Sequence, residues 1–224
     1  MVRILHMIGG LNIGGSQTMI MNIYREIDRT KLQFDFIVDH ADQLYFADEI
    51  KSLGGKIYVL PRFKGSNIYQ VIKAWNRFFS THSEYKIFHS HVRSYASLYI
   101  PIAKKYGVIT IIHSHSTSNG NGFSSIIKKI LQYPLRYQAD FLFACSDKAG
   151  KWLYGRRAVE KRKYKIIPNS IDPYKFIFNY QMRKQLRDRL GIKNEFVIGN
   201  VGRLVKPKNQ KFLLRLFKDI YVMD

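Results

Sequence analysis

Short apolar runs and amphipathic stretches alternate along this chain, and this alternation constrains its fold more than any other feature. The runs at residues 3–8, 34–38 and 108–113 have the length and composition of strands. Between the first two, residues 16–28 carry apolar side chains at helical spacing. Strand–helix alternation is typical of βαβ units with right-handed crossovers. The sequence therefore predicts an α/β fold: a Rossmann-like, mostly parallel sheet with helices on both faces.

The same rhythm continues through most of the chain. The run 109–112 contains no charged residue, as expected for a parallel strand that is covered on both faces. Pro134 lies inside an amphipathic stretch and predicts a kink or a split there. The predicted strands are 3–8, 34–38, 56–60, 86–89, 108–113, 140–144 and 165–167, and the predicted helices are 16–28, 45–53, 68–79, 95–106, 124–137 and 148–154.

A second unit is predicted near the end of the chain. A charged helix over 182–190 ends at Gly191, and an apolar strand at 195–202 and an amphipathic helix at 210–221 follow it. One strand and one helix cannot bury a core of their own. We therefore expect an N-terminal Rossmann-like domain at 1–178, a linker helix at 179–194 and the start of a second Rossmann-like domain at 195–224.

The net charge is the most unusual part of the composition. Thirty-seven Lys and Arg residues against 16 Asp and Glu residues give +21 at pH 7, which favours an anionic partner. The cations are densest over 148–165, where Trp152, Tyr154 and Tyr164 are interleaved as in a face that lies on an anionic membrane. A solvated basic surface is the alternative. Nucleic acid is disfavoured, because no nucleic-acid-binding motif is present.

Cysteine usage and hydropathy bear on the compartment. Cys145 is the only cysteine, so the chain can form no internal disulfide, which favours a reducing, cytoplasmic setting. No run approaches the ~20 apolar residues that span a bilayer. The short apolar N-terminus lacks the basic region and the cleavage site of a signal peptide.

The first candidate site is the glycine loop that follows the first predicted strand. Ligands of an open parallel sheet bind outside the carboxyl ends of its strands. The loop from Gly9 to Ser16 holds four glycines and precedes a helix, whose N–H groups and dipole attract anions. Its spacing matches neither a dinucleotide fingerprint nor, with Ser16 in place of lysine, a P-loop. It is either a phosphate or sugar site or a tight strand-to-helix turn.

Two histidine pairs end predicted strands: His89 with His91, and His113 with His115. Residues two apart in a strand point to the same side, so each pair could offer two metal ligands. No cysteine or well-placed carboxylate completes such a site, and we predict no metal. Two such loops facing one cleft instead favour contacts with a polyhydroxylated ligand.

A fourth loop follows the last predicted strand. Arg203 and Lys208 lie between that strand and the N-terminus of a helix, which is a favourable place for a diphosphate. An ordinary basic loop would have the same spacing. The loop alone therefore does not decide between the two.

Taken together, five segments resemble glycosyltransferase family 4, and within it the capsular and exopolysaccharide type. Each segment is weak alone, but the segments occur in the family's order over nearly the whole chain. They are Gly14-Gly15-Ser16-Gln17, His113-Ser114-His115, Phe143-Ala144-Cys145-Ser146, Ile167-Pro168-Asn169-Ser170-Ile171-Asp172, and Val201-Gly202-Arg203 with Lys208-Asn209.

The resemblance implies a GT-B architecture of two Rossmann-like domains. The N-terminal domain would hold an acceptor, and the C-terminal domain would hold most of a nucleotide sugar, UDP-linked. Transfer would retain the anomeric configuration, with no obligatory metal and no cofactor besides this donor. The acceptor would be a saccharide or a polyprenyl-linked saccharide at the inner face of the membrane, in surface polysaccharide synthesis.

The resemblance also implies roles for single residues. His113 matches the family's active-site histidine, which touches the transferred sugar. Gly14 and Gly15 match a backbone segment close to the donor phosphate and the acceptor. Arg203 and Lys208 match the pair that neutralises the leaving diphosphate. The further binding candidates are His115, Ser146 and Asn169, the last in the segment that closes the first domain.

One family motif is missing. Members carry paired glutamates late in the second domain, where they position the donor, but no glutamate follows Glu195. The sequence thus resembles a family member that is truncated in its C-terminal domain, and we expect it to be inactive as it stands. The alternative is a non-catalytic fragment that binds an acceptor or an anionic membrane.

Overall fold

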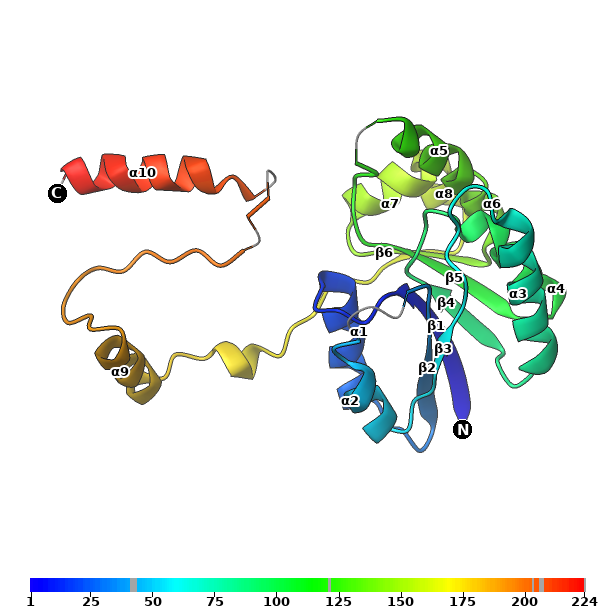
Figure 1. Cartoon of the computed structure of the whole chain (residues 1–224), viewed down its shortest axis with the longest axis horizontal. Helices are drawn as coiled ribbons and strands as arrows, with labels where there is room; N and C mark the ends of the chain where they lie inside the picture. Colours follow the sequence, from blue (N-terminus) through cyan, green and yellow to red (C-terminus); the bar gives the residue numbers. More distant parts are fainter. Residues whose placement is uncertain (41–43, 121, 203, 206–207, 224) are drawn as a thin grey trace. The chain divides into compact units, whose positions relative to one another are not determined.

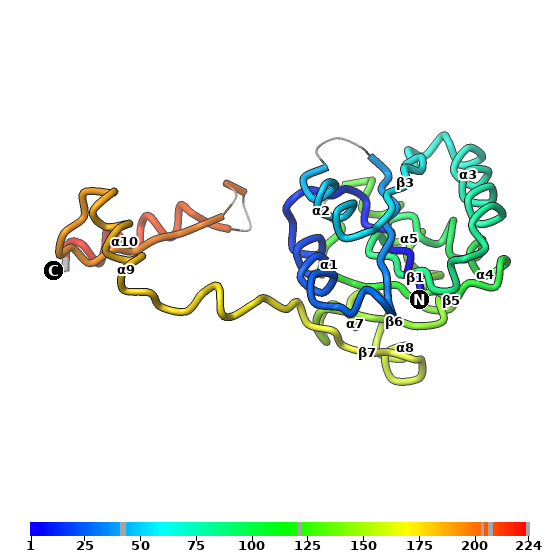
Figure 2. The backbone as a smooth tube through the Cα atoms, turned by 90° about the horizontal axis from the view of Figure 1, so that it is seen from below, coloured from blue at the N-terminus to red at the C-terminus, as the bar shows by residue number. Residues whose placement is uncertain are grey.

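The computed structural model describes residues 1–40, 44–120, 122–202, 204–205 and 208–223. The chain forms two compact units, Met1–Asp172 (unit 1) and Pro173–Asp224 (unit 2). Unit 1 holds the sheet and the helices that cover it, seen from two directions in Figures 1 and 2.

Unit 1 is built around a seven-stranded sheet in which every strand pair is parallel (Figure 1). Its strands are β1 (Val2–Gly9), β2 (Leu32–Val38), β3 (Ile57–Val59), β4 (Ile87–Ser90), β5 (Ile109–Ser114), β6 (Phe141–Ala144) and β7 (Tyr164–Ile166). Their order is β3-β2-β1-β4-β5-β6-β7, so the direction in which strands are added reverses between β1 and β4. The predicted Rossmann-like α/β fold is confirmed.

Helices cover both faces of this sheet. They are α1 (Gly15–Glu26), α2 (Ala47–Ser52), α3 (Ile68–Thr81), α4 (Ile100–Lys105) after the 3-10 turn η1 (Ala96–Leu98), α5 (Phe123–Gln132), α6 (Leu135–Gln138), α7 (Asp147–Tyr154) and α8 (Arg156–Lys161). In Figure 1, α1 and α2 lie on one side of the sheet, and α3, α4 and α6 lie on the other. Each side has a core of its own, one around Tyr24 and Phe36 and one around Trp75 and Phe88.

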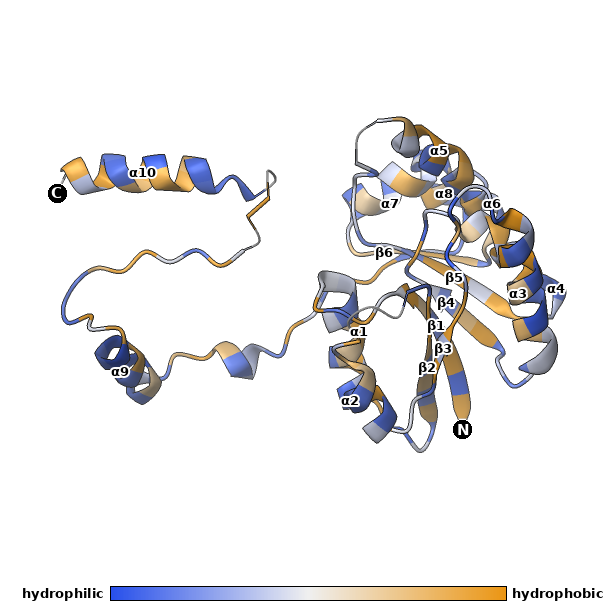
Figure 3. Cartoon of the chain, viewed as in Figure 1, coloured by the Kyte–Doolittle hydropathy of each residue, from blue (hydrophilic) through white to orange (hydrophobic). Residues whose placement is uncertain are grey.

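The strands send alternate side chains into these two cores, which explains why apolar residues dominate their sequences (Figure 3). In β1, Leu5 and Met7 belong to the core around Trp75, whereas Ile4 and Ile8 pack in the core around Tyr24. A strand buried on both faces has no position at which an exposed polar residue is needed. The predominance of apolar residues on both faces of the strands is therefore a property of a covered parallel sheet.

Asp35 in β2 is fully buried and ties together the segments around it. Arg3 donates to both of its carboxylate oxygens at 2.6 Å. The Tyr85 hydroxyl and the Lys56 backbone N–H each donate to it at 2.7 Å. The hydrogen bond to Asp35 raises the pKa of Arg3. These contacts join β1 and β2 to the residues that precede β3 and β4, and they supply the partners that a buried charge requires.

Proline positions explain two helix boundaries. The predicted split at Pro134 is confirmed, because α5 ends at Gln132 and α6 begins at Leu135. The single helix predicted over 95–106 is wrong, because η1 precedes a separate α4 whose first turn contains Pro101. Proline has no N–H to donate, so it fits the first turn of a helix and not its interior.

The described residues of unit 2 include the 3-10 turn η2 (Pro173–Phe176) and the helices α9 (Tyr180–Arg189) and α10 (Gln210–Met223). Both helices confirm the prediction. The strand predicted at 195–202 is wrong: these residues form no strand, and Phe196 is 90% exposed. A strand requires a neighbour that exchanges hydrogen bonds with it, and the described part of unit 2 holds no strand to pair with.

Candidate functional site

The strand order of the sheet reverses between β1 and β4, and we call this place the switch point. Open parallel sheets bind their ligands at such a point, outside the carboxyl ends of the strands. Four segments meet there: the glycine loop before α1, the residues after β4, those after β5, and the segment after β7. Asn22 of α1 donates to the Ser170 carbonyl at 3.2 Å, and Arg93 after β4 donates to the Ser116 carbonyl at 2.8 Å. Residues that are far apart along the chain therefore lie together at this edge of the sheet.

Side chains lie close to two glycines of the loop, Gly10 and Gly14. A Cβ at Gly10 would strike the His40 ring, and one at Gly14 would lie 2.7 Å from Oε1 of Gln17. Gln17 braces the loop by donating to the Gly10 carbonyl at 3.1 Å. Gly14 precedes α1 and provides no side-chain cap. The N–H groups of the first turn are therefore available to an anionic ligand.

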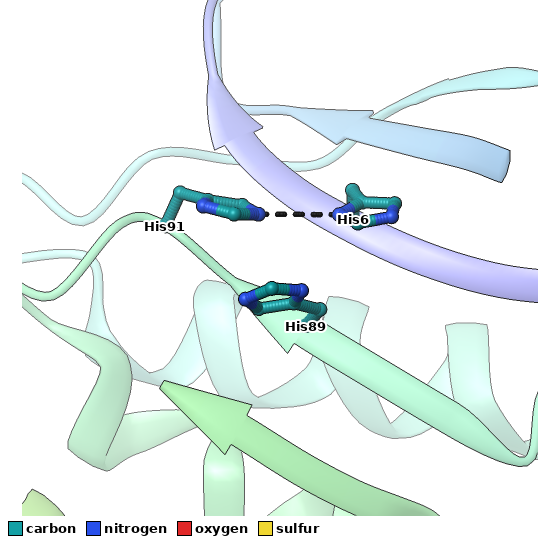
Figure 4. A group of neighbouring side chains, drawn as sticks. All are labelled: His6, His89 and His91. Atoms are coloured by element: carbon teal, nitrogen blue, oxygen red, sulfur yellow. Dashed lines mark hydrogen bonds between the residues drawn. The ribbon is translucent and has the colours of Figure 1, made fainter. Parts of the chain in front are cut away.

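Five histidines gather beside this loop: His6 from β1, His89 and His91 from β4 and the residue after it, and His113 and His115 from β5 and the residue after it. The two-residue spacing places each pair on one side of its strand, with ring centroids 4.2 Å apart for His89 and His91 and 4.1 Å apart for His113 and His115. Figure 4 shows His6, His89 and His91 facing one another across β1 and β4. The register pairs His6 with His89 directly.

Three of the rings form a hydrogen-bonded chain. Nδ1 of His6 and Nε2 of His91 are 3.1 Å apart (Figure 4). Nδ1 of His91 and Nε2 of His115 are 2.8 Å apart. His91 therefore links a ring in the interior of the sheet to a ring at its carboxyl edge.

Burial keeps these imidazoles neutral. It lowers the pKa of His6 and that of His113 to about 3, and the pKa of His115 to about 4. The pKa values of His89 and His91 also lie well below the ordinary value, because burial and neighbouring imidazoles oppose a charge. At neutral pH each ring can accept one hydrogen bond and donate another.

Neutral imidazoles are also potential metal ligands. One nitrogen from each of His6, His89 and His91 lies within 4.8 Å of the others, and the same holds for His91, His113 and His115. Such donor sets suit zinc and other transition ions. No carboxylate belongs to either set among the described residues, and the absence of a metal stays a prediction.

A pocket of about 330 Å³ opens beside His91 and His115. Arg62, Arg93 and Lys128 line it, and the described lining includes no carboxylate. Arg93 is fixed by the Ser116 hydroxyl at 2.7 Å and by the Trp152 ring 4.9 Å below its guanidinium. Burial lowers the pKa of Arg93. Because a partly buried cation favours a counter-charge, the pocket attracts anions. Its other polar side chains include Ser16, Ser94, Ser118, Asn119 and Gln132.

Residues 13–175 match the sequence profile described as Glycosyltransferase Family 4. The chain belongs to glycosyltransferase family 4. It is 32% identical over 219 residues to EpsF of Bacillus subtilis (strain 168), and the alignment covers 96% of this chain and 57% of EpsF. It is 34% identical over 100 residues to the glycosyltransferase MJ1059 of Methanocaldococcus jannaschii, which covers 44% of this chain and 24% of that protein. This family 4 chain thus spans little more than half the length of EpsF.

Solved structures share the fold of this family 4 chain. Anabaena HepE, crystallised with UDP and glucose, matches 96% of the chain and 57% of its own length with a TM-score of 0.72 and 18% identity. A Rickettsia africae glycosyltransferase matches 86% of the chain and 50% of its own length, with a TM-score of 0.59 and 13% identity. The architecture is that of GT-B glycosyltransferases.

The structure brings most of the family-implied residues of unit 1 together. A Cβ at Gly15 would lie 3.9 Å from the Asn169 amide nitrogen, and Asn169 also contacts His115. His113 is fully buried in β5 next to this group. Ser146 caps α7 instead, because its hydroxyl accepts from Ala149 N–H at 3.2 Å.

Two of the predicted residues belong to unit 2. Lys208 is exposed there, and Arg203 lies outside the described residues. Sequence reasoning missed His6 and Arg93. Like β4 and β5, β1 carries a histidine, but His6 lies in the middle of its strand and not at its end, so the search for residues that follow strands did not find it.

The basic segment at 148–165 differs from its predicted form. Its cations, among them Lys148 and Arg157, are exposed as expected. Of its aromatic residues, Trp152 and Tyr164 are half-buried, whereas Tyr154 is fully buried and donates to the Ile112 and Phe143 carbonyls at 2.8 and 2.9 Å. Helix α7 turns Tyr154 inward because it covers the sheet, so the prediction of an interfacial ring is wrong for Tyr154. Across the described ranges, no helix combines the length and the hydropathy needed to cross a bilayer.

Proposed function

We propose that the intact protein transfers a sugar from a nucleotide-sugar donor, UDP-linked, to a saccharide or polyprenyl-linked acceptor in surface polysaccharide synthesis. Membership of family 4, the similarity to EpsF and the fold shared with HepE, which was crystallised with UDP-glucose, support this proposal. The activity is assigned to the whole protein, because this chain spans 57% of EpsF.

The observation that carries the proposal is the meeting of an uncapped helix N-terminus with a neutral, buried histidine at the switch point. The first turn of α1 suits a phosphate group. Neither ring nitrogen of His113 has a side-chain hydrogen-bond partner among the described residues, and the polar contact that acts on its pKa there comes from the Ile167 backbone. A buried polar atom of this kind indicates a ligand or a water that completes it. In this role His113 contacts the transferred sugar, and transfer retains the anomeric configuration without a metal.

Arg203 and Lys208 are proposed to act in the second domain. There they would neutralise the diphosphate that leaves with the nucleotide, at the point where negative charge develops in the transition state. Gly14 and Gly15 would approach the donor phosphate with their backbone, and Asn169 and His115 would bind sugar hydroxyls.

The test uses the full-length protein with UDP-glucose and other UDP-sugars, and it measures release of UDP. His113→Asn is expected to slow release about a hundredfold, whereas His82→Asn, outside the site, is the matched control and retains the parent rate. Arg203→Ala is expected to weaken nucleotide binding. The proposal is wrong if no donor is hydrolysed or transferred and Arg203→Ala leaves nucleotide affinity unchanged.

A second candidate function applies to the 224 residues alone. They would be a non-catalytic piece that binds an acceptor or an anionic membrane, because unit 2 contains no described sheet to hold a nucleotide. Turnover of a nucleotide sugar by this chain without further sequence would refute this candidate.

The proposed location is the cytoplasm, with peripheral attachment to the inner face of the membrane. The net charge of +21 and the single cysteine support it. Fractionation of cells in low and high salt tests it: the protein should sediment with membranes at low salt and be released when salt screens the charge.

A further inference from the structure

Helix α5 turns most of its large apolar side chains toward solvent, although its Leu131 packs partly buried against the core. Its buried residues are Ser125 and Gln132. Its isoleucines face solvent: Ile126 is 54% and Ile130 is 66% exposed, and Phe123 at its first turn is 77% exposed. Two tyrosines continue this surface beyond the end of α5. We define the α5 face as Phe123, Ile126, Ile127, Ile130, Tyr133 and Tyr137, all of them exposed.

An exposed apolar surface of this kind marks a contact with something outside the folded unit. A helix that packs on a sheet turns its largest apolar side chains inward, as α3 does with Val71, Trp75 and Phe78. In α5, Gln132 is instead held inside by a pair of hydrogen bonds with Asn119, at 2.8 and 3.0 Å. This polar anchor fixes the helix with its apolar side outward.

The charges around the α5 face select the partner. Residues 115–139 contain Lys128, Lys129 and Arg136 and no Asp or Glu. Arg136 lies over the Tyr133 ring at 4.3 Å, so a cation and an aromatic ring share the border of the apolar surface. Apolar side chains bordered by aromatic rings and cations are typical of helices that lie in the headgroup region of an anionic bilayer.

We propose that the α5 face is the surface by which unit 1 docks on an anionic phospholipid bilayer. Its apolar side chains enter the interface, and Lys128, Lys129 and Arg136 contact lipid phosphates. Helix α5 lies at the periphery of unit 1 (Figures 1 and 3). The α5 face consists of a different set of residues from the basic segment at 148–165.

Docking on this surface would also place the anion-attracting pocket at the membrane. Lys128 and Gln132 of α5 line that pocket together with Arg93. A phosphate carried by a membrane-anchored acceptor saccharide would then meet three cations and no carboxylate of the described lining. This assignment of the acceptor class rests on the proposed transfer reaction, whereas the docking itself does not.

The experiment measures sedimentation of the full 224-residue chain with vesicles of phosphatidylcholine, with and without about one third phosphatidylglycerol. The double variant Ile126→Asn with Ile130→Asn is expected to lower the partition coefficient on the anionic vesicles by at least about tenfold. The matched control is Tyr69→Asn with Ile72→Asn on α3, where the two side chains are 76% and 38% exposed. This control should bind like the parent.

A second pair of variants compares how much the cations of α5 and those of the basic segment at 148–165 contribute to vesicle binding. Lys128→Gln with Lys129→Gln should weaken binding more than Arg156→Gln with Arg157→Gln on α8. The Phe123→Trp variant gives a direct probe of depth: its fluorescence should shift to the blue on anionic vesicles and be quenched by brominated lipid. Circular dichroism and thermal melting of each variant establish that it is folded.

Three results would overturn the proposal. The α5 variant could bind vesicles as the parent does, the α3 control could lose as much binding, or the tryptophan could stay in water. A change in oligomeric state on α5 substitution without a change in vesicle binding would assign the face to a second copy of the chain instead. Loss of vesicle binding with transfer to a soluble acceptor intact in the full-length protein would leave the proposed function standing.

Discussion

The buried imidazoles predict that unit 1 loses stability in mildly acidic solution, above the range in which ordinary carboxylates titrate. The pKa of His6 and that of His113 are about 3 in the folded chain, and the pKa of His115 is about 4. An unfolded histidine binds its proton near 6.5. The unfolded state therefore binds more protons below pH 6.5, so stability is complete above that pH and falls as the pH drops toward the folded pKa.

The size of the effect follows from these values. When the pH falls from about 8 to about 5, protonation of each of the three rings in the unfolded chain lowers the free energy of unfolding by about 2 kcal/mol. Together the three rings lower it by about 6 kcal/mol. A loss of this size is comparable to the whole stability of many domains. Urea unfolding followed by tryptophan fluorescence measures it in unit 1, since Trp75 and Trp152 are the only tryptophans.

One substitution isolates the contribution of a single imidazole ring to the pH dependence of stability. The His6 ring lies 4.4 Å from the Phe34 ring and stacks on Phe36 at 5.7 Å, so His6→Phe places an apolar ring among aromatic neighbours. The pH-dependent loss should shrink by about 2 kcal/mol. His82→Gln, outside the cluster, should keep the parent dependence. The reasoning is refuted if stability does not change between pH 7 and pH 5, or if His6→Phe keeps the full loss.

Three further predictions concern stability at neutral pH. Arg3→Met leaves the Asp35 carboxylate buried without its cation and should cost about 3–5 kcal/mol in chemical unfolding. Gly55→Ala places a Cβ within 2.8 Å of three neighbouring atoms, among them the Phe34 carbonyl oxygen, and should lower the melting temperature through a cost of about 1–3 kcal/mol. Ser146→Ala removes the cap of α7 and should cost about 1 kcal/mol in the same assay, whereas a melting curve equal to that of the parent would show that the cap contributes nothing.

The order of elements in unit 1 was predictable because it depends on local patterns. Runs of strand length, the proline at position 134 and apolar spacing in the helices are all visible in the sequence. Helix α8 escaped prediction because it is short and charged and follows Gly155, whose positive φ ends α7. The strand order of the sheet was not predictable, because the pairing of distant strands leaves no local signal.

The candidate site was predictable only in its parts. The glycine loop and the two histidine pairs are visible because they follow strands. The hydrogen bond between His6 and His91 joins residues 85 positions apart, and no spacing rule reaches that far. The outward orientation of the α5 isoleucines was not predicted. Helical spacing identifies the apolar side of a helix, but it does not show whether protein or lipid covers that side.

The chain of three imidazoles has a consequence for the placement of single protons. A neutral imidazole carries one proton, and each of the two hydrogen bonds in the chain needs one donor and one acceptor. His6, His91 and His115 must therefore all be protonated on Nδ1 or all on Nε2. A sugar hydroxyl that binds His115 and selects one of its tautomers therefore also selects the tautomer of His6. Ligand binding at the carboxyl edge of the sheet thus determines which nitrogen of a ring in the interior carries the proton.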